Sequence, residues 1–274
     1  MLIMGEYSNW GHVMLHEESS FQGLKDFNIY YQKWLPPAGV KAVLLVSHGF
    51  AEHSGRYNNV VNYFVPKGYA VYALDHRGHG RSDGERVQVD DFYDYVIDLR
   101  TFFSLVRRET PSDKIFLVGH SMGSAIALLY TAEYQRDLDG LITSGGGMAK
   151  PGDPPMPRHP AGQPLPTAML SRDRAVIEAY ENDPLVYRGP IPEGLQLFSI
   201  MGKFPEIVPQ ISIPVLIMAG NGGPDGARSQ VLYEYIGSRD KTLKLYEGLL
   251  HEIFNEPEYP QVMSDMESWL DAHL

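Results

Sequence analysis

The sequence predicts an α/β fold, with a mostly parallel sheet, helices on both of its faces and an inserted cap. Short apolar runs alternate with segments of helical periodicity as far as residue 144, and strands and helices in this order form a parallel sheet. The pentapeptide 119–123, Gly-His-Ser-Met-Gly, stands between one such strand and one such helix. A proline-rich stretch at 151–166 then interrupts the alternation.

Composition narrows the classes of protein to which the chain can belong. Its 274 residues and 43% hydrophobic content suffice for one large core. The net charge of −11 disfavours nucleic acid as a partner, and the absence of cysteine excludes disulfides and a thiol nucleophile. The opening run Met-Leu-Ile-Met is too short for a signal peptide, and no stretch approaches the roughly 18 apolar residues of a membrane span. We therefore expect a cytoplasmic protein.

The first half of the chain is predicted to alternate between strands and helices. Residues 40–46 are the first fully apolar run, which indicates a central parallel strand. Asp90 or Asp91 is expected to cap a helix whose buried face consists of Phe92, Tyr95, Val96, Leu99, Phe103 and Val106. The other predicted elements are two antiparallel edge strands within 16–35, strands at 69–74, 114–118 and 138–144, and helices at 57–67 and 124–132.

The second half contains an insertion before the sheet resumes. We expect this insertion to form a cap over the carboxyl ends of the strands, where ligands bind in open α/β sheets. The predicted cap is 147–205, and the predicted core is 1–146 with 206–274. In the cap, helices are expected near 171–181 and 193–202. In the core, strands are expected at 213–219 and 242–246, and helices near 227–237 and 258–272.

The pentapeptide 119–123 has the pattern of a nucleophile elbow, Gly-x-Ser-x-Gly between a strand and a helix. The turn strains the serine backbone, and glycines two residues before and after Ser121 relieve the crowding. Ser121 is therefore the predicted nucleophile, and the alternative is a glycine-rich turn without chemistry.

A serine hydroxyl needs a base, and the negative charge that develops on the substrate needs N–H donors. In this architecture the histidine follows the last strand, which selects His251. The predicted donors are the backbone N–H groups of Met122, at the start of the helix after the elbow, and of Phe50, in the loop after the first parallel strand.

Several stretches resemble the monoacylglycerol lipases of the α/β-hydrolase superfamily, and the likeness spans most of residues 25–272. They include His48-Gly49, Glu52-His53-Ser54-Gly55-Arg56-Tyr57, Asp75-His76-Arg77-Gly78-His79-Gly80, residues 182–185 and 240–248, and His251-Glu252-x-Phe254-Asn255-Glu256-Pro257. The resemblance implies an α/β-hydrolase fold and a serine hydrolase that cleaves monoacylglycerols to fatty acid and glycerol. A small lipid ester is then the partner, and no cofactor is needed.

The resemblance also implies that Glu52 and Arg56 hold the glycerol end of the substrate while the acyl chain runs under the cap. A local ion pair that shapes the oxyanion loop is an equally good and compatible reading of these two residues. The apolar cap residues predicted to contact the acyl chain are Leu195, Leu197, Phe198, Ile200 and Met201. The alternative is that they only fasten the cap to the sheet. We also expect a weak contact of the cap with membrane surfaces.

The polar loop 75–84 contains Asp75, His76, His79 and Asp83, which could in principle bind a metal. Glycines separate these residues and no supporting set of ligands is evident, so we expect a structural loop beside the nucleophile and no metal.

Three features depart from the family pattern. Ala51 replaces a glycine, which is expected to narrow the oxyanion loop, and the cap is shorter than usual. Gly223 stands where the family has its acid, so the nearby carboxylate is Asp225, five residues after Gly220. Either Asp225 orients His251 from a displaced position, or no acid does. The alternatives to a monoacylglycerol lipase are a broader carboxylesterase or lysophospholipase, and a non-catalytic ligand-binding member of the fold.

Overall fold

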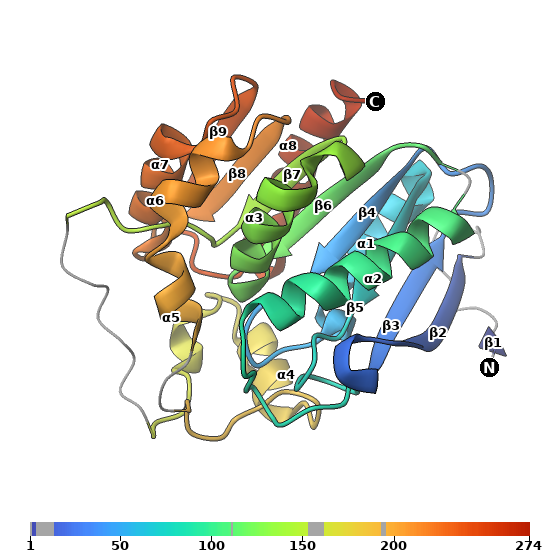
Figure 1. The fold of residues 1–274 in the computed structure, drawn as a ribbon, viewed down its shortest axis with the longest axis horizontal. Helices are drawn as coiled ribbons and strands as arrows, with labels where there is room; N and C mark the ends of the chain where they lie inside the picture. Colours follow the sequence, from blue (N-terminus) through green and yellow to red (C-terminus); the bar gives the residue numbers. More distant parts are fainter. Residues whose placement is uncertain (1, 4–13, 111, 153–161, 193–195) are drawn as a thin grey trace.

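The centre of the molecule is one mixed sheet (Figure 1). The computed structural model describes residues 2–3, 14–110, 112–152, 162–192 and 196–274, and within them the sheet has nine strands in the order β1-β2-β3-β5-β4-β6-β7-β8-β9. Strands β4 to β9 pair parallel with one another, whereas β1 with β2, β2 with β3 and β3 with β5 pair antiparallel. The strands are β1 (Leu2–Ile3), β2 (Leu15–Gln22), β3 (Asn28–Leu35), β4 (Ala42–Ser47), β5 (Tyr69–Leu74), β6 (Ile115–His120), β7 (Gly140–Ser144), β8 (Val215–Gly220) and β9 (Lys241–Tyr246).

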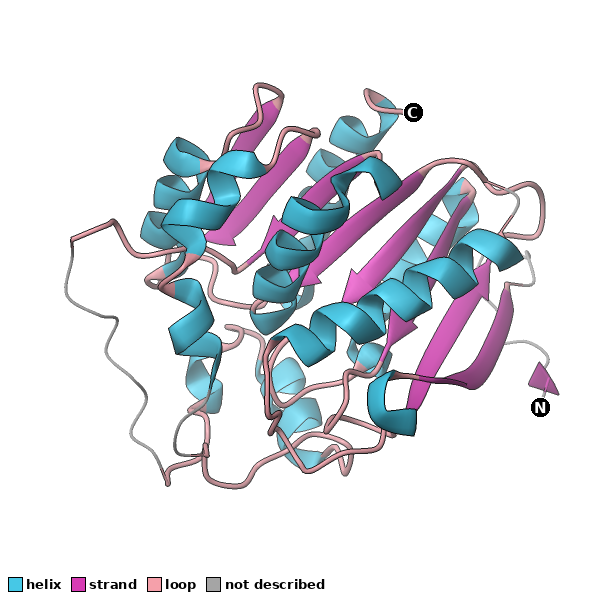
Figure 2. Cartoon of the chain, in the orientation of Figure 1, coloured by secondary structure: helices cyan, strands magenta, loops and turns pink. Residues whose placement is uncertain are grey.

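Helices cover both faces of the sheet (Figure 2). They are α1 (Asn58–Phe64), α2 (Tyr93–Glu109), α3 (Met122–Tyr134), α4 (Arg174–Asn182), α5 (Gln196–Met201), α6 (Phe204–Ile207), α7 (Asp225–Tyr235) and α8 (Tyr259–Asp271). Side chains alternate along each strand, so Val43 and Leu45 of β4 pack with α2, α3 and α7, whereas Leu44 and Val46 pack with α1 and α8. The parallel strands are therefore buried on both faces, as their continuous apolar sequences predict.

The structure confirms the predicted α/β architecture and its order of elements. The predicted buried face of α2 is at most 6% exposed at every position, and the side chain of Asp91 accepts a hydrogen bond from the Tyr93 N–H at 2.9 Å. Two short elements, β1 and α6, were not predicted. With two and four residues respectively, they are too short to show a period in the sequence.

The segment between β7 and β8 lies beyond the carboxyl ends of the central strands (Figure 1). It carries α4 and α5, and backbone hydrogen bonds join it to core loops, from Tyr187 N–H to Ala51 O at 2.8 Å and from His251 N–H to Met169 O at 3.2 Å. The predicted end of the cap at residue 205 falls inside α6, whose Phe204 is buried in the core. The division into cap and core remains a prediction.

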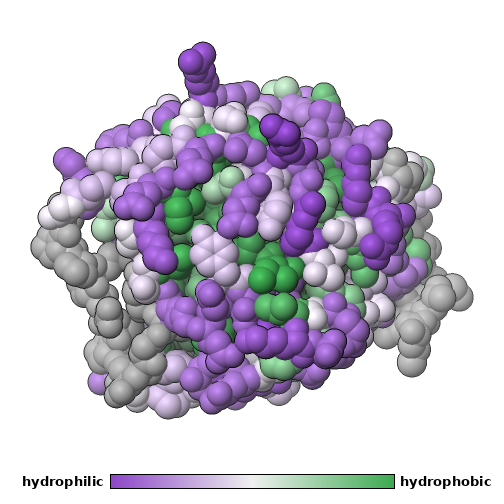
Figure 3. Space-filling view, in the orientation of Figure 1, coloured by the Kyte–Doolittle hydropathy of each residue, from purple (hydrophilic) through white to green (hydrophobic). Residues whose placement is uncertain are grey.

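The surface in Figure 3 is largely hydrophilic, with apolar side chains in small patches between charged ones. Within the described residues, no helix combines the length and the apolar character that a membrane span requires. The expected contact of the cap with membranes remains a prediction.

Candidate active site

The elbow places Ser121 at a sharp corner between β6 and α3. Ser121 has φ 53° and ψ −117°, a backbone conformation that residues other than glycine rarely adopt. A Cβ atom at Gly119 would lie 2.5 Å from the carbonyl oxygen of Gly123, and one at Gly123 would lie 1.9 Å from the carbonyl oxygen of Ser47. Both glycines are therefore sterically required, for the reason that the sequence suggested.

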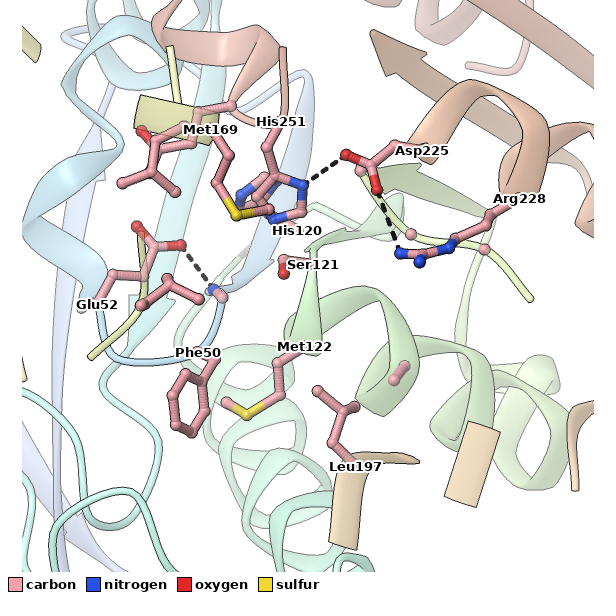
Figure 4. A pocket seen from close by; sticks show the side chains of 18 of the residues that line it. Phe50, Glu52, His120, Ser121, Met122, Met169, Leu197, Asp225, Arg228 and His251 are labelled. Atoms are coloured by element: carbon pink, nitrogen blue, oxygen red, sulfur yellow. Dashed lines mark hydrogen bonds and ion pairs between the residues drawn. The ribbon is translucent and has the colours of Figure 1, made fainter. Parts of the chain in front are cut away.

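His251 and Asp225 meet beside the elbow (Figure 4). The Nδ1–H of His251 donates to Oδ2 of Asp225 at 2.7 Å, and both side chains are largely buried. Because Nδ1 is used in this way, the neutral imidazole presents its lone pair at Nε2. Ser121, His251 and Asp225 line one pocket.

Asp225 reaches His251 from the first residue of α7. Gly223, at the family position of the acid, lies in the preceding loop, and Gly222 comes so close to the loop before His251 that a Cβ there would be 2.6 Å from the Gly248 carbonyl oxygen. The positive end of the α7 dipole also favours a carboxylate at this place. The distance between Asp225 Oδ2 and His251 Nδ1 is short enough for Asp225 to orient the imidazole. The catalytic role of Asp225 remains a proposal.

The surroundings of His251 favour its protonated form. Burial alone lowers the pKa of His251, but the hydrogen bond and the charge of Asp225 outweigh burial and raise the pKa above 6.5. Burial of Asp225 raises the pKa of its carboxyl group, but the hydrogen bond to His251 and the nearby charges of His251, Arg228 and His120 together outweigh burial and lower that pKa. The neighbouring ring of His120 lies 4.9 Å from that of His251, and burial lowers the pKa of His120 to about 4.

This electrostatic environment predicts the pH dependence of ester hydrolysis. If His251 is the base, its neutral form is required, so kcat/KM should fall as the pH drops through its raised pKa. The acid limb is then expected above pH 6.5, to be measured on a short soluble ester between about pH 4 and 9. Circular dichroism over the same range controls for unfolding. A rate that stays constant down to about pH 4 would contradict this role of His251.

The predicted oxyanion donors come from two different segments of the chain. Met122 begins α3, so its N–H has no acceptor within the helix, and Phe50 lies in the loop after β4. Both residues line the pocket. Ala51, at the family glycine position, has φ 67° in the left-handed region. The alanine therefore strains the oxyanion loop where glycine would not.

Arg56 joins the oxyanion loop to the loop that carries His251. It contacts both oxygens of Glu252 at 2.7 and 2.8 Å and Oε2 of Glu52 at 2.8 Å. The other oxygen of Glu52 accepts from the Gly49 N–H at 2.6 Å. Burial raises the pKa of Glu52, but the charge of Arg56 and the other donors outweigh it and bring the pKa to about 2. The expected local ion pair is thus present, and Glu52, unlike Arg56, also lines the pocket.

The sequence analysis assigned no role to Glu252, although this residue directly follows His251. The sequence around Glu252 does not indicate that its carboxylate pairs with Arg56. A second pocket residue that was missed is Arg228, whose guanidinium lies 3.9 Å from Asp225.

Hydrogen bonds engage part of the polar atoms considered as metal ligands in the loop 75–84, whereas Nδ1 of His76 and Nε2 of His79 are buried without a partner among the described residues. Asp75 accepts from the N–H and the hydroxyl of Ser54 and from the Arg81 N–H. Nε2 of His76 lies 2.8 Å from Oγ of Ser47. Across the part of the chain that the structure describes, no three potential ligands are grouped as a metal would require.

The pocket in front of Ser121 has a volume of about 180 Å³ and both polar and apolar lining residues. Glu52, His120 and Glu252 lie together in the polar part of the lining. Asp225 and Arg228 also line the pocket, on the opposite side of Ser121 from Glu52 (Figure 4). The apolar lining includes Leu165, Met169, Leu170, Ile191, Leu197, Met201 and Phe204. Of the predicted cap contacts, Leu197 and Met201 line the pocket and Ile200 is buried, whereas Leu195 and the side chain of Phe198 lie outside the described residues.

Known proteins resemble this chain over most of its length. Residues 38–258 match the family described as "Serine aminopeptidase, S33". A monoacylglycerol lipase of Mycolicibacterium smegmatis is 36% identical, over 94% of this chain and 98% of the relative, and human monoglyceride lipase is 32% identical, over 88% and 86%. The crystal structure of a monoacylglycerol lipase of Paleococcus ferrophilus superposes with a TM-score of 0.76 at 27% identity, covering 90% of this chain and 99% of that one.

Proposed function

This chain belongs to the monoacylglycerol lipase family of the α/β-hydrolase superfamily and is a serine ester hydrolase, and from that premise we propose that it cleaves monoacylglycerols to fatty acid and glycerol. One observation carries the proposal: Ser121, His251 and Asp225 line a pocket whose other lining residues include both a group of polar side chains and many apolar ones. Such a pocket fits an ester that has a small polyol on one side and a single acyl chain on the other.

The proposed reaction follows from the positions of these groups. Oγ of Ser121 attacks the ester carbonyl, and Nε2 of His251 takes the hydroxyl proton. Asp225 holds the imidazole through Nδ1 and stabilises its positive charge. The N–H groups of Met122 and Phe50 donate to the oxyanion. His251 then protonates the leaving glycerol oxygen, and a water molecule, deprotonated by the same imidazole, releases the fatty acid.

The part of the pocket lined by Glu52, His120 and Glu252 is the proposed site of the glycerol moiety. Glu52 and Glu252 are the carboxylates in this part of the lining, and we assign Glu52 to a glycerol hydroxyl. The guanidinium of Arg56 is occupied by hydrogen bonds to Glu52 and Glu252, and Arg56 does not line the pocket. We therefore propose that it holds Glu52 in place. The substrate role of Arg56 is therefore proposed to be indirect.

A comparison of head groups at a fixed acyl chain tests the substrate class. We expect kcat/KM for a monoacylglycerol to exceed that for a lysophospholipid of the same chain by about tenfold or more, because the carboxylate of Glu52 repels the negatively charged phosphate of the lysophospholipid. Equal rates on the two esters would favour a broader carboxylesterase or lysophospholipase.

The apolar lining predicts the response to acyl-chain length. Leu197→Ala and Met201→Ala should lower kcat/KM for long-chain monoacylglycerols by about tenfold while changing the rate on a short ester little, since each buried methylene contributes about 0.8 kcal/mol. Leu245→Ala is the matched control, because Leu245 is 41% exposed on β9 and does not line the pocket. A uniform loss at every chain length would indicate that these residues only fasten the cap.

A further inference from the structure

The carboxylate of Asp225 has a second neighbour besides His251. Arg228 follows Asp225 by three positions on α7, a spacing that makes residues neighbours on a helix surface. Nη1 of Arg228 lies 3.9 Å from Oδ1 of Asp225, whereas Oδ2 accepts from Nδ1 of His251 at 2.7 Å (Figure 4). Each carboxylate oxygen thus faces a different group.

The backbone of Arg228 is fixed against the end of β7. Its carbonyl oxygen accepts from the Met148 N–H at 3.3 Å. A Cβ atom at Gly147 would lie 2.5 Å from the Arg228 carbonyl carbon, so a glycine is needed for this close approach. The side chain then extends into the pocket wall and is 32% exposed. Among the described residues, Asp225 is the one carboxylate within 4.0 Å of its guanidinium.

We propose that Arg228 is a positioning residue, which holds the free oxygen of Asp225 and so aims the displaced acid at His251. The inference rests on the proposed role of Asp225 as the acid. A carboxylate with one hydrogen bond can still rotate about its Cβ–Cγ bond, whereas a contact at each oxygen restricts that rotation. The family position of the acid lies in a loop, so the need for this second contact arises from the displacement onto a helix.

Arg228 also adds a positive charge near the proposed base. The other charged or titratable groups that face His251 are Asp225, His120, Glu52 and Glu252. A nearby positive charge opposes protonation of an imidazole. Removal of Arg228 should therefore move the acid limb of the pH–rate profile to higher pH, a change that a purely structural residue would not produce.

A double-mutant cycle tests the inference on an activated fluorogenic ester. We expect Arg228→Gln to lower kcat about fivefold with little change in KM, which corresponds to the strength of a partly exposed ion pair. In an Asp225→Asn background, Arg228→Gln should have no further effect, because the group through which it acts is already changed. Arg228→Lys should restore most of the rate, and Arg239→Gln is the control, since Arg239 is exposed and outside the pocket.

The outcomes separate this inference from the proposed function. An equal loss from Arg228→Gln in both backgrounds would overturn it, because Arg228 would then act on the substrate or the fold. Unchanged kcat in Arg228→Gln, together with a strong loss in Asp225→Asn, would also overturn it and leave the proposed acid intact. Full activity of Asp225→Asn would remove the proposed acid and the inference together. If Arg228→Gln folds poorly by circular dichroism, Arg228→Met, which also removes the charge, takes its place: its acid limb should lie at higher pH, and an unchanged limb would overturn the inference.

Discussion

Ser121→Ala should abolish ester hydrolysis, with a loss of about 10⁶ in kcat, because the side chain that forms the acyl-enzyme is removed. The fold should survive. Alanine can adopt the strained backbone of position 121 as well as serine can, and the glycines that permit it remain. Hydrolysis of a monoacylglycerol measures the loss, and thermal unfolding measures the stability of the variant.

A matched substitution and a chemical probe complete this test. Ser268→Ala, on the exposed side of α8, should keep full activity. A fluorophosphonate should label the parent protein and Ser268→Ala but not Ser121→Ala, because the reagent requires an activated serine. Substantial hydrolysis by a folded Ser121→Ala protein would remove the proposed mechanism. Absence of labelling in the parent would favour a non-catalytic, ligand-binding protein.

Asp225→Asn should lower kcat by about 10⁴, because an amide cannot stabilise the imidazolium and favours the wrong tautomer of His251. The pH profile should change in a defined direction. The carboxylate of Asp225 raises the pKa of His251, so its removal should move the acid limb of kcat/KM to lower pH. Both effects are measured on the same short ester.

The control for Asp225→Asn is the same substitution at another helix start. Asp91 accepts a hydrogen bond from the N–H of Tyr93 at the beginning of α2, and asparagine can replace it there. Asp91→Asn should therefore keep both activity and stability. If Asp225→Asn hydrolyses esters as fast as the parent, then His251 works with Ser121 as a dyad or another acid orients it.

Most of the fold could be predicted because its elements have strong local signals. The strands β4, β6 and β8 are continuous apolar runs, and α2 has a regular buried face. The nucleophile elbow could also be predicted, because glycines are required at positions 119 and 123 by close contacts within the turn. By contrast, the two-residue strand β1 depends on pairing with β2, and no pattern of its own sequence marks it.

The site was predictable as a set of residues but not as a set of contacts. Whether Asp225 reaches His251 depends on where α7 begins, and the glycine-rich sequence before it permits several paths. The pairing of Arg56 with Glu252 joins positions 196 residues apart, so only tertiary structure reveals it. The contact between Arg228 and Asp225 likewise depends on α7 beginning at Asp225, which places the two residues one helical turn apart.

The glycine at position 223 bears on how an enzyme can change its acid during evolution. A Cβ atom at Gly223 would meet nothing within 4 Å, and its φ lies outside the left-handed region, so an aspartate fits there without strain. If Asp225 is the acid, as proposed, a chain with carboxylates at both 223 and 225 would carry the family acid and its replacement together. Either could then be lost without a step through an inactive intermediate, and mutational drift would decide which remained. Two descendants could thus share one chemistry while their acids occupy different columns of a sequence alignment.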